Sequence, residues 1–242
     1  MLVNTKNHYD QHLSHFYSWM VGDFEQKAAE QQTFFEKNGI IPESFGLAID
    51  LGAGHGLQAI PLARLGFSVT AIDFSAVLLK ELEERKGHLD ISTIEADITD
   101  TNWHGSLKPE LVVCMGDTIS HLESFEQLEA LTLTLSNLLT REGKLIYSFR
   151  DYSQALEDTQ RFIPVKSDSN RIHTCLLEYF DNTVRVTDLL HEKQGDIWQQ
   201  QVSSYTKLRL TSDMVSAMIE KSGLNLISEG VHNRMSYLIA QK

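Results

Sequence analysis

Cysteine is scarce in this sequence of 242 residues, since Cys114 and Cys175 are the only two and each lies inside an apolar run. So few cysteines exclude a disulfide-rich scaffold. A chain of this length buries enough surface to build a full hydrophobic core without disulfides or metals. We therefore predict two buried free thiols in a reducing compartment.

Basic residues and long apolar runs are also scarce. Lys and Arg together number 21 against 33 Asp and Glu, which gives a net charge of −12 at neutral pH. So acidic a surface gains no counterion release from a nucleic acid or an anionic membrane. No window approaches the roughly 18 apolar residues of a membrane span, and residues 1–16 contain no apolar signal-peptide core. These absences predict a cytoplasmic protein with no nucleic-acid or membrane partner, and they leave the oligomeric state open.

The middle of the chain alternates short apolar segments with helical ones. Strands are expected at 46–51, 68–73, 91–95, 111–115 and 144–149, and helices at 57–65, 76–85 and 123–139. Strands that alternate with helices of about ten residues indicate βαβ crossovers and a mostly parallel sheet. We predict an α/β fold.

Both ends of the chain and the region after the fifth strand follow other patterns. Residues 8–38 have the character of a helix, and a helix at 213–222 with strands near 224–231 and 235–241 completes the core. Residues 171–180, 183–192 and 197–210 alternate with period two and are joined by hairpin-turn residues. We predict a single domain, 1–242, with the following parts: an N-terminal helical cover (1–40), a core (41–155 and 211–242) and an inserted antiparallel β-meander (156–210) over the acceptor pocket.

A glycine-rich loop follows the first expected strand, at Asp50-Leu51-Gly52-Ala53-Gly54-His55-Gly56-Leu57. In an open α/β sheet, ligands bind at the carboxyl ends of the strands. Gly52 and Gly54 permit a tight turn and close approach of a ligand to the backbone. A dinucleotide fingerprint needs its third glycine where Leu57 stands, so a nicotinamide-dependent reductase is disfavoured, and the missing Gly-Lys-Ser/Thr excludes a P-loop.

An acidic residue, Asp73, ends the second expected strand. A carboxylate at this place can accept hydrogen bonds from both hydroxyls of a ribose. Together with the glycine loop, it predicts a nucleoside ligand that lacks a pyrophosphate.

These residues resemble the nucleotide-binding signature of class I S-adenosylmethionine-dependent methyltransferases, over roughly residues 45–150. The resemblance implies a Rossmann-like three-layer α/β/α sheet with an antiparallel last strand, and S-adenosyl-L-methionine as the cofactor. Three further segments are similar to that family: Glu95-Ala96-Asp97-Ile98 at the adenine, Met115-Gly116-Asp117 at the methionine end, and an aromatic N-terminal cover. The implied cofactor site comprises Tyr9, Tyr17, Trp19, Asp50, Gly52, Ala53, Gly54, Asp73, Phe74, Ala96, Asp97, Ile98, Met115, Gly116 and Asp117.

Two segments resemble the glycine and sarcosine N-methyltransferase branch of that family. Residues 116–122 (GDTISHL) are similar to its Gly-Asn-Ser-Phe-Ala-His-Leu, and residues 150–153 (RDYS) to its Arg-Asn-Tyr-Asp; Trp103 also has a counterpart. Both segments exchange amides and carboxylates, which leaves the acceptor open. Arg150, Arg171, Arg185 and Tyr205 are candidates for acceptor binding.

Methyl transfer to a neutral nucleophile requires positioning and desolvation more than acid–base chemistry, whereas a hydroxyl acceptor would need a base. His121 is the first candidate for that base and Tyr152 the second, with helix capping and local packing as alternative roles. Cys114 lies within a strand and is expected to be buried and inert. His8, His12 and His15 are spaced like metal ligands, but no neighbouring Cys, Asp or Glu completes a set, so we expect a solvated face and no metal.

The sequence therefore predicts an S-adenosylmethionine-dependent enzyme that methylates a small molecule, most plausibly at nitrogen. Small-molecule O-methylation and a non-catalytic protein that keeps the cofactor fold remain the alternatives. Because Asp50, Asp73, Asp97 and Asp117 all follow strands, we also expect part of the acidic excess to face one cleft and attract a cationic sulfonium.

Overall fold

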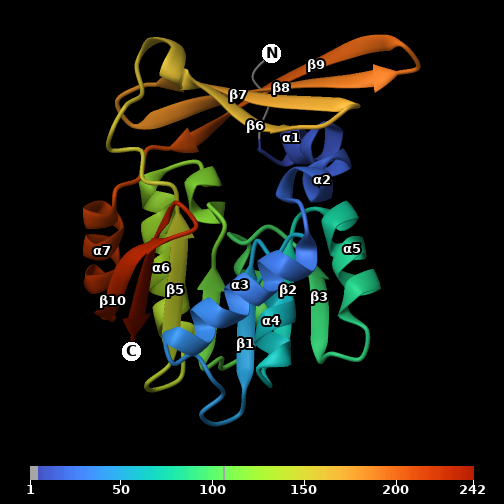
Figure 1. The fold of residues 1–242 in the computed structure, drawn as a ribbon. Helices are drawn as coiled ribbons and strands as arrows, with labels where there is room; N and C mark the ends of the chain where they lie inside the picture. The colour runs from blue at the N-terminus through green and yellow to red at the C-terminus, as the bar shows by residue number, and fades with distance from the viewer. Residues whose placement is uncertain (1–4, 106) are drawn as a thin grey trace.

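Seven strands form the main sheet of the computed structural model, which describes residues 5–105 and 107–242 (Figure 1). Their spatial order is β10-β11-β5-β4-β1-β2-β3. Strand β11 pairs antiparallel with both of its neighbours, whereas the pairs among β1 to β5 are parallel. The fold class, a mostly parallel sheet with an antiparallel last strand, is confirmed. The strands are β1 (Leu47–Leu51), β2 (Ser68–Asp73), β3 (Ile91–Glu95), β4 (Leu111–Cys114), β5 (Lys144–Phe149), β10 (Asn225–His232) and β11 (Met235–Gln241).

Helices cover both faces of this sheet. Helices α3 (Phe24–Lys37), α4 (Ala59–Arg64) and α5 (Ala76–Lys86) pack on one face, and α6 (Phe125–Leu138) and α7 (Ser212–Lys221) on the other. Successive strand residues point to opposite faces, so Val112 and Cys114 join the core beneath α6 while Val113 joins the other. The central strands are therefore mostly apolar, as a doubly covered sheet requires, and the whole of β4 is apolar.

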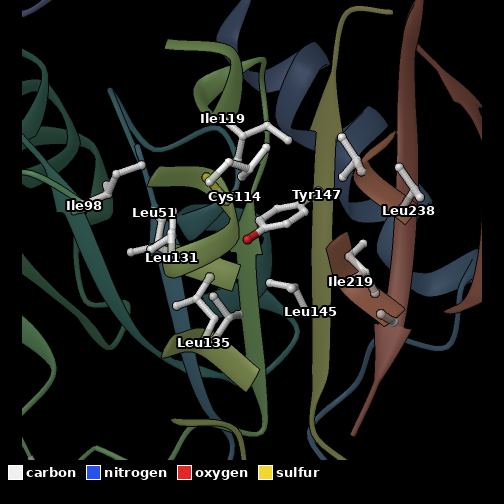
Figure 2. Packing of buried hydrophobic residues seen from close by; sticks show 14 of the residues in the cluster. Leu51, Ile98, Cys114, Ile119, Leu131, Leu135, Leu145, Tyr147, Ile219 and Leu238 are labelled. Atoms are coloured by element: carbon white, nitrogen blue, oxygen red, sulfur yellow. The ribbon is translucent and has the colours of Figure 1, made fainter. Parts of the chain in front are cut away.

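The core beneath α6 and α7 is continuous and closely packed. Figure 2 shows Tyr147 of β5 among Cys114, Leu131 and Leu145. Its hydroxyl lies 3.0 Å from that of Thr132 on α6, so the one polar atom of this ring is satisfied inside the core. Cys114 is fully buried, as expected, and burial holds the pKa of its thiol well above the ordinary value.

A second, four-stranded antiparallel sheet in the order β6-β7-β8-β9 lies over the carboxyl end of the main sheet (Figure 1). It comprises β6 (Phe162–Ser167), β7 (Arg171–Tyr179), β8 (Thr183–Gln194) and β9 (Ile197–Leu208). The last three strands correspond to the predicted meander. Strand β6 was not predicted, because Pro164 and a register shift before Lys166 break its alternation; both are features that an edge strand tolerates.

The N-terminal segment differs from the predicted continuous helix. It consists of α1 (Thr5–Gln11), a 3₁₀ turn (Leu13–His15) and α2 (Tyr17–Val21), and α3 follows a break at Gly22. Gly22 adopts φ 96°, and the side chain of Asp23 then caps α3 by accepting from the amide of Gln26. Among the described residues no helix is long and apolar enough to cross a membrane.

The expected solvated histidine face is also corrected. His8 and His12 are buried, and only His15 of the three is exposed. The reason is that residues 5–21 pack beneath the four-stranded sheet, where Leu13 and Phe16 contact Leu190 of β8.

Candidate active site

A cavity of about 640 Å³ lies at the carboxyl ends of the main-sheet strands. The loops after β1, β2, β3 and β4 form its floor, and α1, α2 and β9 contribute the rest of the wall. The structure thus brings together most of the predicted cofactor residues in one lining, namely Tyr9, Tyr17, Gly52, Ala53, Gly54, Asp73, Phe74, Asp97, Ile98, Met115 and Gly116.

The glycine loop after β1 leaves no room for side chains at its first turn. Gly52 has φ 72°, and a Cβ there would lie 2.4 Å from the side chain of Thr118. Gly54 donates its backbone N–H to Asp73 Oδ2 at 2.8 Å. The loop is therefore held against the end of β2, with its backbone facing the cavity.

Asp73 is fixed at the end of β2 by two backbone amides. Its Oδ2 accepts from Gly54 and its Oδ1 from Ser75, both at 2.8 Å. Burial raises the pKa of this carboxyl to about 6, although the two amides and Lys6 oppose the rise. One accepted bond per oxygen leaves each oxygen able to accept another, which is the capacity a ribose diol requires.

Asp97 occupies the equivalent place after β3. Its Oδ1 accepts from the backbone N–H of Thr99 at 2.8 Å and from the Thr99 hydroxyl at 2.7 Å. This local turn orients the carboxylate at the cavity wall and leaves Oδ2 as an acceptor. Ala96 lies outside the lining, because it packs on the core and donates its amide to the Asp73 carbonyl at 3.0 Å.

Asp50 lies behind the loop rather than in the cavity wall. It is fully buried in β1, and burial raises its pKa to about 8, with the charge of Asp73 adding to the rise and the backbone at Ala59 opposing it. The carboxyl is therefore protonated at neutral pH. It adds no negative charge to the cleft, contrary to the electrostatic expectation.

Asp117 is likewise neutralised, by a lysine from the four-stranded sheet. Lys207 Nζ of β9 donates to Asp117 Oδ2 at 2.5 Å, and the Arg150 amide donates to Oδ1 at 2.9 Å. Burial alone would raise the pKa of Asp117, but the charge of Lys207, together with His121 and the hydrogen bonds from Arg150 and Lys207, outweighs it and holds the pKa below the ordinary value. Asp117 lies outside the lining, while Lys207 is part of it. Only Asp73 and Asp97 remain as the expected acidic groups of the cleft.

His121 lines the cavity close to this ion pair. Its ring stacks on Tyr205 with centroids 5.5 Å apart and meets the edge of Tyr9 at 5.7 Å. Burial, and then the neighbouring charge of Lys207, lower its pKa to about 3. A neutral imidazole of this kind accepts a hydrogen bond but is a weak proton acceptor, which disfavours the predicted role of general base.

Several candidate residues lie away from the cavity. Trp19 donates its indole N–H to Asp168 at 2.5 Å and packs beside Lys166 and Arg171, so it joins the cover to β6 and β7. Tyr152 is buried and contacts Tyr179 edge-on.

The predicted acceptor-binding arginines are engaged elsewhere or exposed. Arg171 pairs with Glu192 at 2.6 Å, Arg185 approaches Glu178 at 3.6 Å, and the side chain of Arg150 is exposed. Tyr205, the remaining candidate, is buried between two histidines rather than in the lining.

Sequence reasoning missed the cationic side chains of the cavity, Lys207 and Lys6, as well as His55. The sequence could have indicated Lys207, because it lies two residues after Tyr205 and so points to the same, inward face of an alternating strand. A lysine on a buried face requires a partner of opposite charge. His55 is packed between the rings of Tyr17 and Phe24, and burial lowers its pKa to about 4.

Comparison with known proteins agrees with this geometry. Residues 48–143 match the family described as a methyltransferase domain. Together, the domain match and the sheet order confirm the resemblance to the class I S-adenosylmethionine-dependent methyltransferases that was stated from the sequence.

The curated relatives that the chain matches have names that also state a substrate. A glycine/sarcosine N-methyltransferase of Aphanothece halophytica is 27% identical over 112 residues, which cover 46% of this chain and 42% of the relative. The glycine N-methyltransferase of Oryctolagus cuniculus is 26% identical over 153 residues, covering 56% and 51%. The chain thus spans about half the length of the curated relatives it matches.

Solved structures share the fold over nearly the whole chain. An S-adenosylmethionine-dependent methyltransferase from Clostridium acetobutylicum superimposes with a TM-score of 0.72 at 17% identity, covering 90% of this chain and 91% of the other. An amino pentose methyltransferase from Micromonospora echinaspora, solved with S-adenosylmethionine bound, gives 0.73 at 13% identity, covering 92% and 93%.

Proposed function

We propose that this protein binds S-adenosylmethionine in the cavity and transfers its methyl group to a nitrogen atom of a small molecule. The residues present fit this cofactor. Asp73 would accept from the ribose, Asp97 from the adenine amino group, and the narrow turn at Gly52 and Gly54 would let the methionine portion approach the backbone. When bound, the cofactor supplies an electrophilic methyl group on a sulfonium.

The aromatic part of the lining suits a cation. Tyr9 and Tyr17 lie in the cavity wall, and Phe74 meets Tyr9 edge-on at 5.5 Å. Burial raises the pKa of Tyr17 to about 12, so the ring stays neutral at physiological pH. Ring faces and two carboxylates attract a sulfonium and exclude water around it, at about 0.5–2 kcal/mol for each ring.

The observation that supports nitrogen is the low basicity of the far end of the cavity. Around His121, whose pKa is about 3, the described lining has three further ionisable side chains. They are Lys207, which is already held by Asp117, Tyr9, whose pKa burial raises well above the ordinary value, and the solvent-exposed Glu123. A hydroxyl acceptor needs a strong base when the methyl group is transferred, whereas an unprotonated amine brings its own lone pair. His121 would then orient the amine as a hydrogen-bond acceptor.

The covering sheet limits the size of the acceptor. Thr183, Thr206 and Lys207 close the cavity from above. This roof favours a small molecule over a macromolecule, and the net charge of −12 disfavours nucleic acid. Lys207 offers a cation to an acidic group of the acceptor, in place of the arginines expected from the sequence. The free thiols of Cys114 and Cys175 favour a reducing compartment such as the cytoplasm.

Two measurements test the proposal. Calorimetry should detect S-adenosylmethionine and S-adenosylhomocysteine binding to the wild type, a loss of at least tenfold in affinity in Asp73→Ala, and no change in the surface control Glu84→Ala. Labelled methyl transfer to a panel of small amines, acids and phenols, followed by mass spectrometry, identifies the modified atom. Absence of cofactor binding would refute the proposal, oxygen labelling would favour an O-methyltransferase, and binding without any transfer would favour a non-catalytic protein.

A further inference from the structure

A second cluster of polar side chains lies between β7 and β8, outside the cavity lining. Cys175 of β7 faces Asp188 of β8 in register, and His173 lies two residues earlier on the same face. Asp188 Oδ1 lies 2.7 Å from Cys175 Sγ and 2.9 Å from His173 Nε2, and the sulfur lies 3.7 Å from that nitrogen. Three ligand-type atoms, a nitrogen, an oxygen and a sulfur, therefore converge in one place.

His8 of α1 approaches the same carboxylate from the other side. Its Nε2 lies 3.0 Å from Asp188 Oδ2, yet neither atom is in a hydrogen bond of normal geometry among the described residues. The Nδ1 atom of His8 lies 2.7 Å from the Ser203 hydroxyl. His8 is therefore placed to hold the Asp188 carboxylate from behind, as second-shell partners hold the ligands of a metal ion.

The histidines and the aspartate of the cluster are buried, whereas Cys175 is only partly buried, contrary to the prediction of two buried thiols. His8 is 0% exposed, His173 1% and Asp188 2%. Buried charged groups are costly unless they are fully paired or coordinate a metal. Here Nδ1 of His173 has no hydrogen-bond partner among the described residues. A network of hydrogen bonds alone therefore leaves the site incompletely satisfied.

We propose that His173, Cys175 and Asp188 bind a zinc ion, with a water molecule as its fourth, tetrahedral ligand and His8 as the second-shell partner of Asp188. Zn²⁺ binds cysteine sulfur at about 2.3 Å and histidine nitrogen at about 2.0–2.1 Å, so its tetrahedral S···N edge is about 3.6 Å, close to the 3.7 Å between Cys175 and His173. The carboxylate oxygen has to move away from the sulfur by about 0.8 Å and from the nitrogen by about 0.4 Å, as expected when a proton between them is replaced by a metal ion.

Charge and proton balance favour this ion. Binding breaks the S–H bond of Cys175 and releases its proton to solvent, while His173 binds through a neutral nitrogen. One thiolate and one carboxylate then cancel the two charges of Zn²⁺, so the buried site becomes neutral. The mixed nitrogen, sulfur and oxygen set suits zinc and is unlike the all-oxygen sets of Mg²⁺ and Ca²⁺.

The position of the site gives it a structural role. His8 belongs to the N-terminal helix, whereas the other three residues belong to the covering sheet. Through the contact of His8 with Asp188, the metal site would therefore cross-link α1 to the roof of the cavity. Tyr205 stacks on His8 at 4.1 Å and on His121 at 5.5 Å, so this cross-link is one ring away from the proposed acceptor end.

Metal binding to the full-length protein tests the proposal independently of methyl transfer. After chelator treatment and dialysis, titration with ZnCl₂ should give one tightly bound equivalent by elemental analysis. Cobalt(II) in its place should show the strong visible bands of tetrahedral coordination and a thiolate-to-cobalt charge-transfer band. The variants Asp188→Asn and His8→Gln should bind zinc at least tenfold more weakly, and Cys175→Ser should lose the charge-transfer band.

The controls are His15→Gln, an exposed histidine of the same segment, and Cys114→Ala, the other thiol; both should bind zinc and cobalt like the wild type. Circular dichroism verifies that each variant is folded. Should the variants fail to fold, the cobalt spectrum of the wild type decides the matter alone. A folded wild type that binds no zinc, or that gives an octahedral cobalt spectrum without the charge-transfer band, would overturn the proposal and leave a hydrogen-bonded cluster.

Discussion

Replacing Asp50 by asparagine should make this protein more stable at pH 8 and slightly less stable at pH 4. The carboxyl is fully buried, and its pKa is raised to about 8 from an ordinary value of 3.8. Between about pH 4 and pH 8, this carboxyl is therefore protonated in the folded chain but ionised in the unfolded chain. Each unit corresponds to 1.36 kcal/mol, so the wild type loses about 5 kcal/mol of stability between pH 4 and pH 8 through this group.

The amide that replaces this carboxyl in the variant cannot ionise, so the loss disappears. Burial of the amide N–H donors costs about 1–3 kcal/mol. The net gain at pH 8 is then about 3 kcal/mol, or roughly 6–12 °C in the midpoint of thermal unfolding. Below pH 4 both chains hold the group neutral in both states, and only the cost of the amide remains.

The assay is thermal unfolding followed by circular dichroism at half-unit steps from pH 4 to pH 8. Asp90→Asn, an exposed carboxyl just before β3, serves as the control and should track the wild type throughout. A difference between Asp50→Asn and the wild type that stays constant with pH would refute the reasoning, because it would mean that Asp50 is ionised in the folded protein.

Three further predictions concern the cavity. Burial raises the pKa of Asp73 to about 6, so the affinity for S-adenosylmethionine should fall by up to tenfold per pH unit below pH 6. The variant Asp73→Asn should not show this pH dependence. An affinity that calorimetry finds unchanged down to pH 5 would contradict the prediction. The variant Lys207→Met leaves Asp117 buried without its counter-ion and should lower the free energy of unfolding in urea by about 3–5 kcal/mol. Adding Asp117→Asn to the same chain should restore most of this stability. If the single and the double variant are equally destabilised, the ion pair does not stabilise the fold. The variant Gly52→Ala should reduce both the stability of the fold and the affinity for the cofactor, because its Cβ would lie 2.4 Å from the nearest side chain. The control Gly87→Ala, at φ 56° in open space, should lose only the stability that its strained backbone costs. Equal effects of the two variants on affinity would exclude a steric role for position 52.

The main sheet was predictable because its signals are local. Strands such as β4 are short apolar runs bounded by polar residues and turns, and caps such as Ser75 at α5 and Thr211 at α7 mark where helices begin. The glycine loop and Asp73 are also close in sequence, 19 residues apart at their hydrogen bond. Pattern and spacing are enough to place such groups together at one edge of the sheet.

What escaped prediction depends on contacts between distant parts of the chain. Lys207 meets Asp117 across 90 residues, and His8 meets Asp188 from another element altogether. No local pattern in the sequence indicates that an N-terminal helix folds beneath a sheet formed by residues 162–208. The histidines of that helix were therefore predicted to form a solvated face. Because of the same packing, Trp19 contacts the covering sheet and does not line the cavity as predicted.

The N-terminal segment, residues 5–21, bridges the two sheets at the mouth of the cavity. Lys6 donates to the carbonyl of Phe74 at 3.0 Å on the main-sheet side, and Ser18 bonds Glu81 on α5. On the other side, Lys166 of β6 donates to the carbonyl of Trp19. If a molecule leaves the cavity past this bridge, exchange of spent for fresh cofactor would be timed by opening of the bridge rather than by the methyl transfer itself. Turnover would then respond to substitutions at Ser18 or Lys166, outside the cavity, as strongly as to changes in the lining.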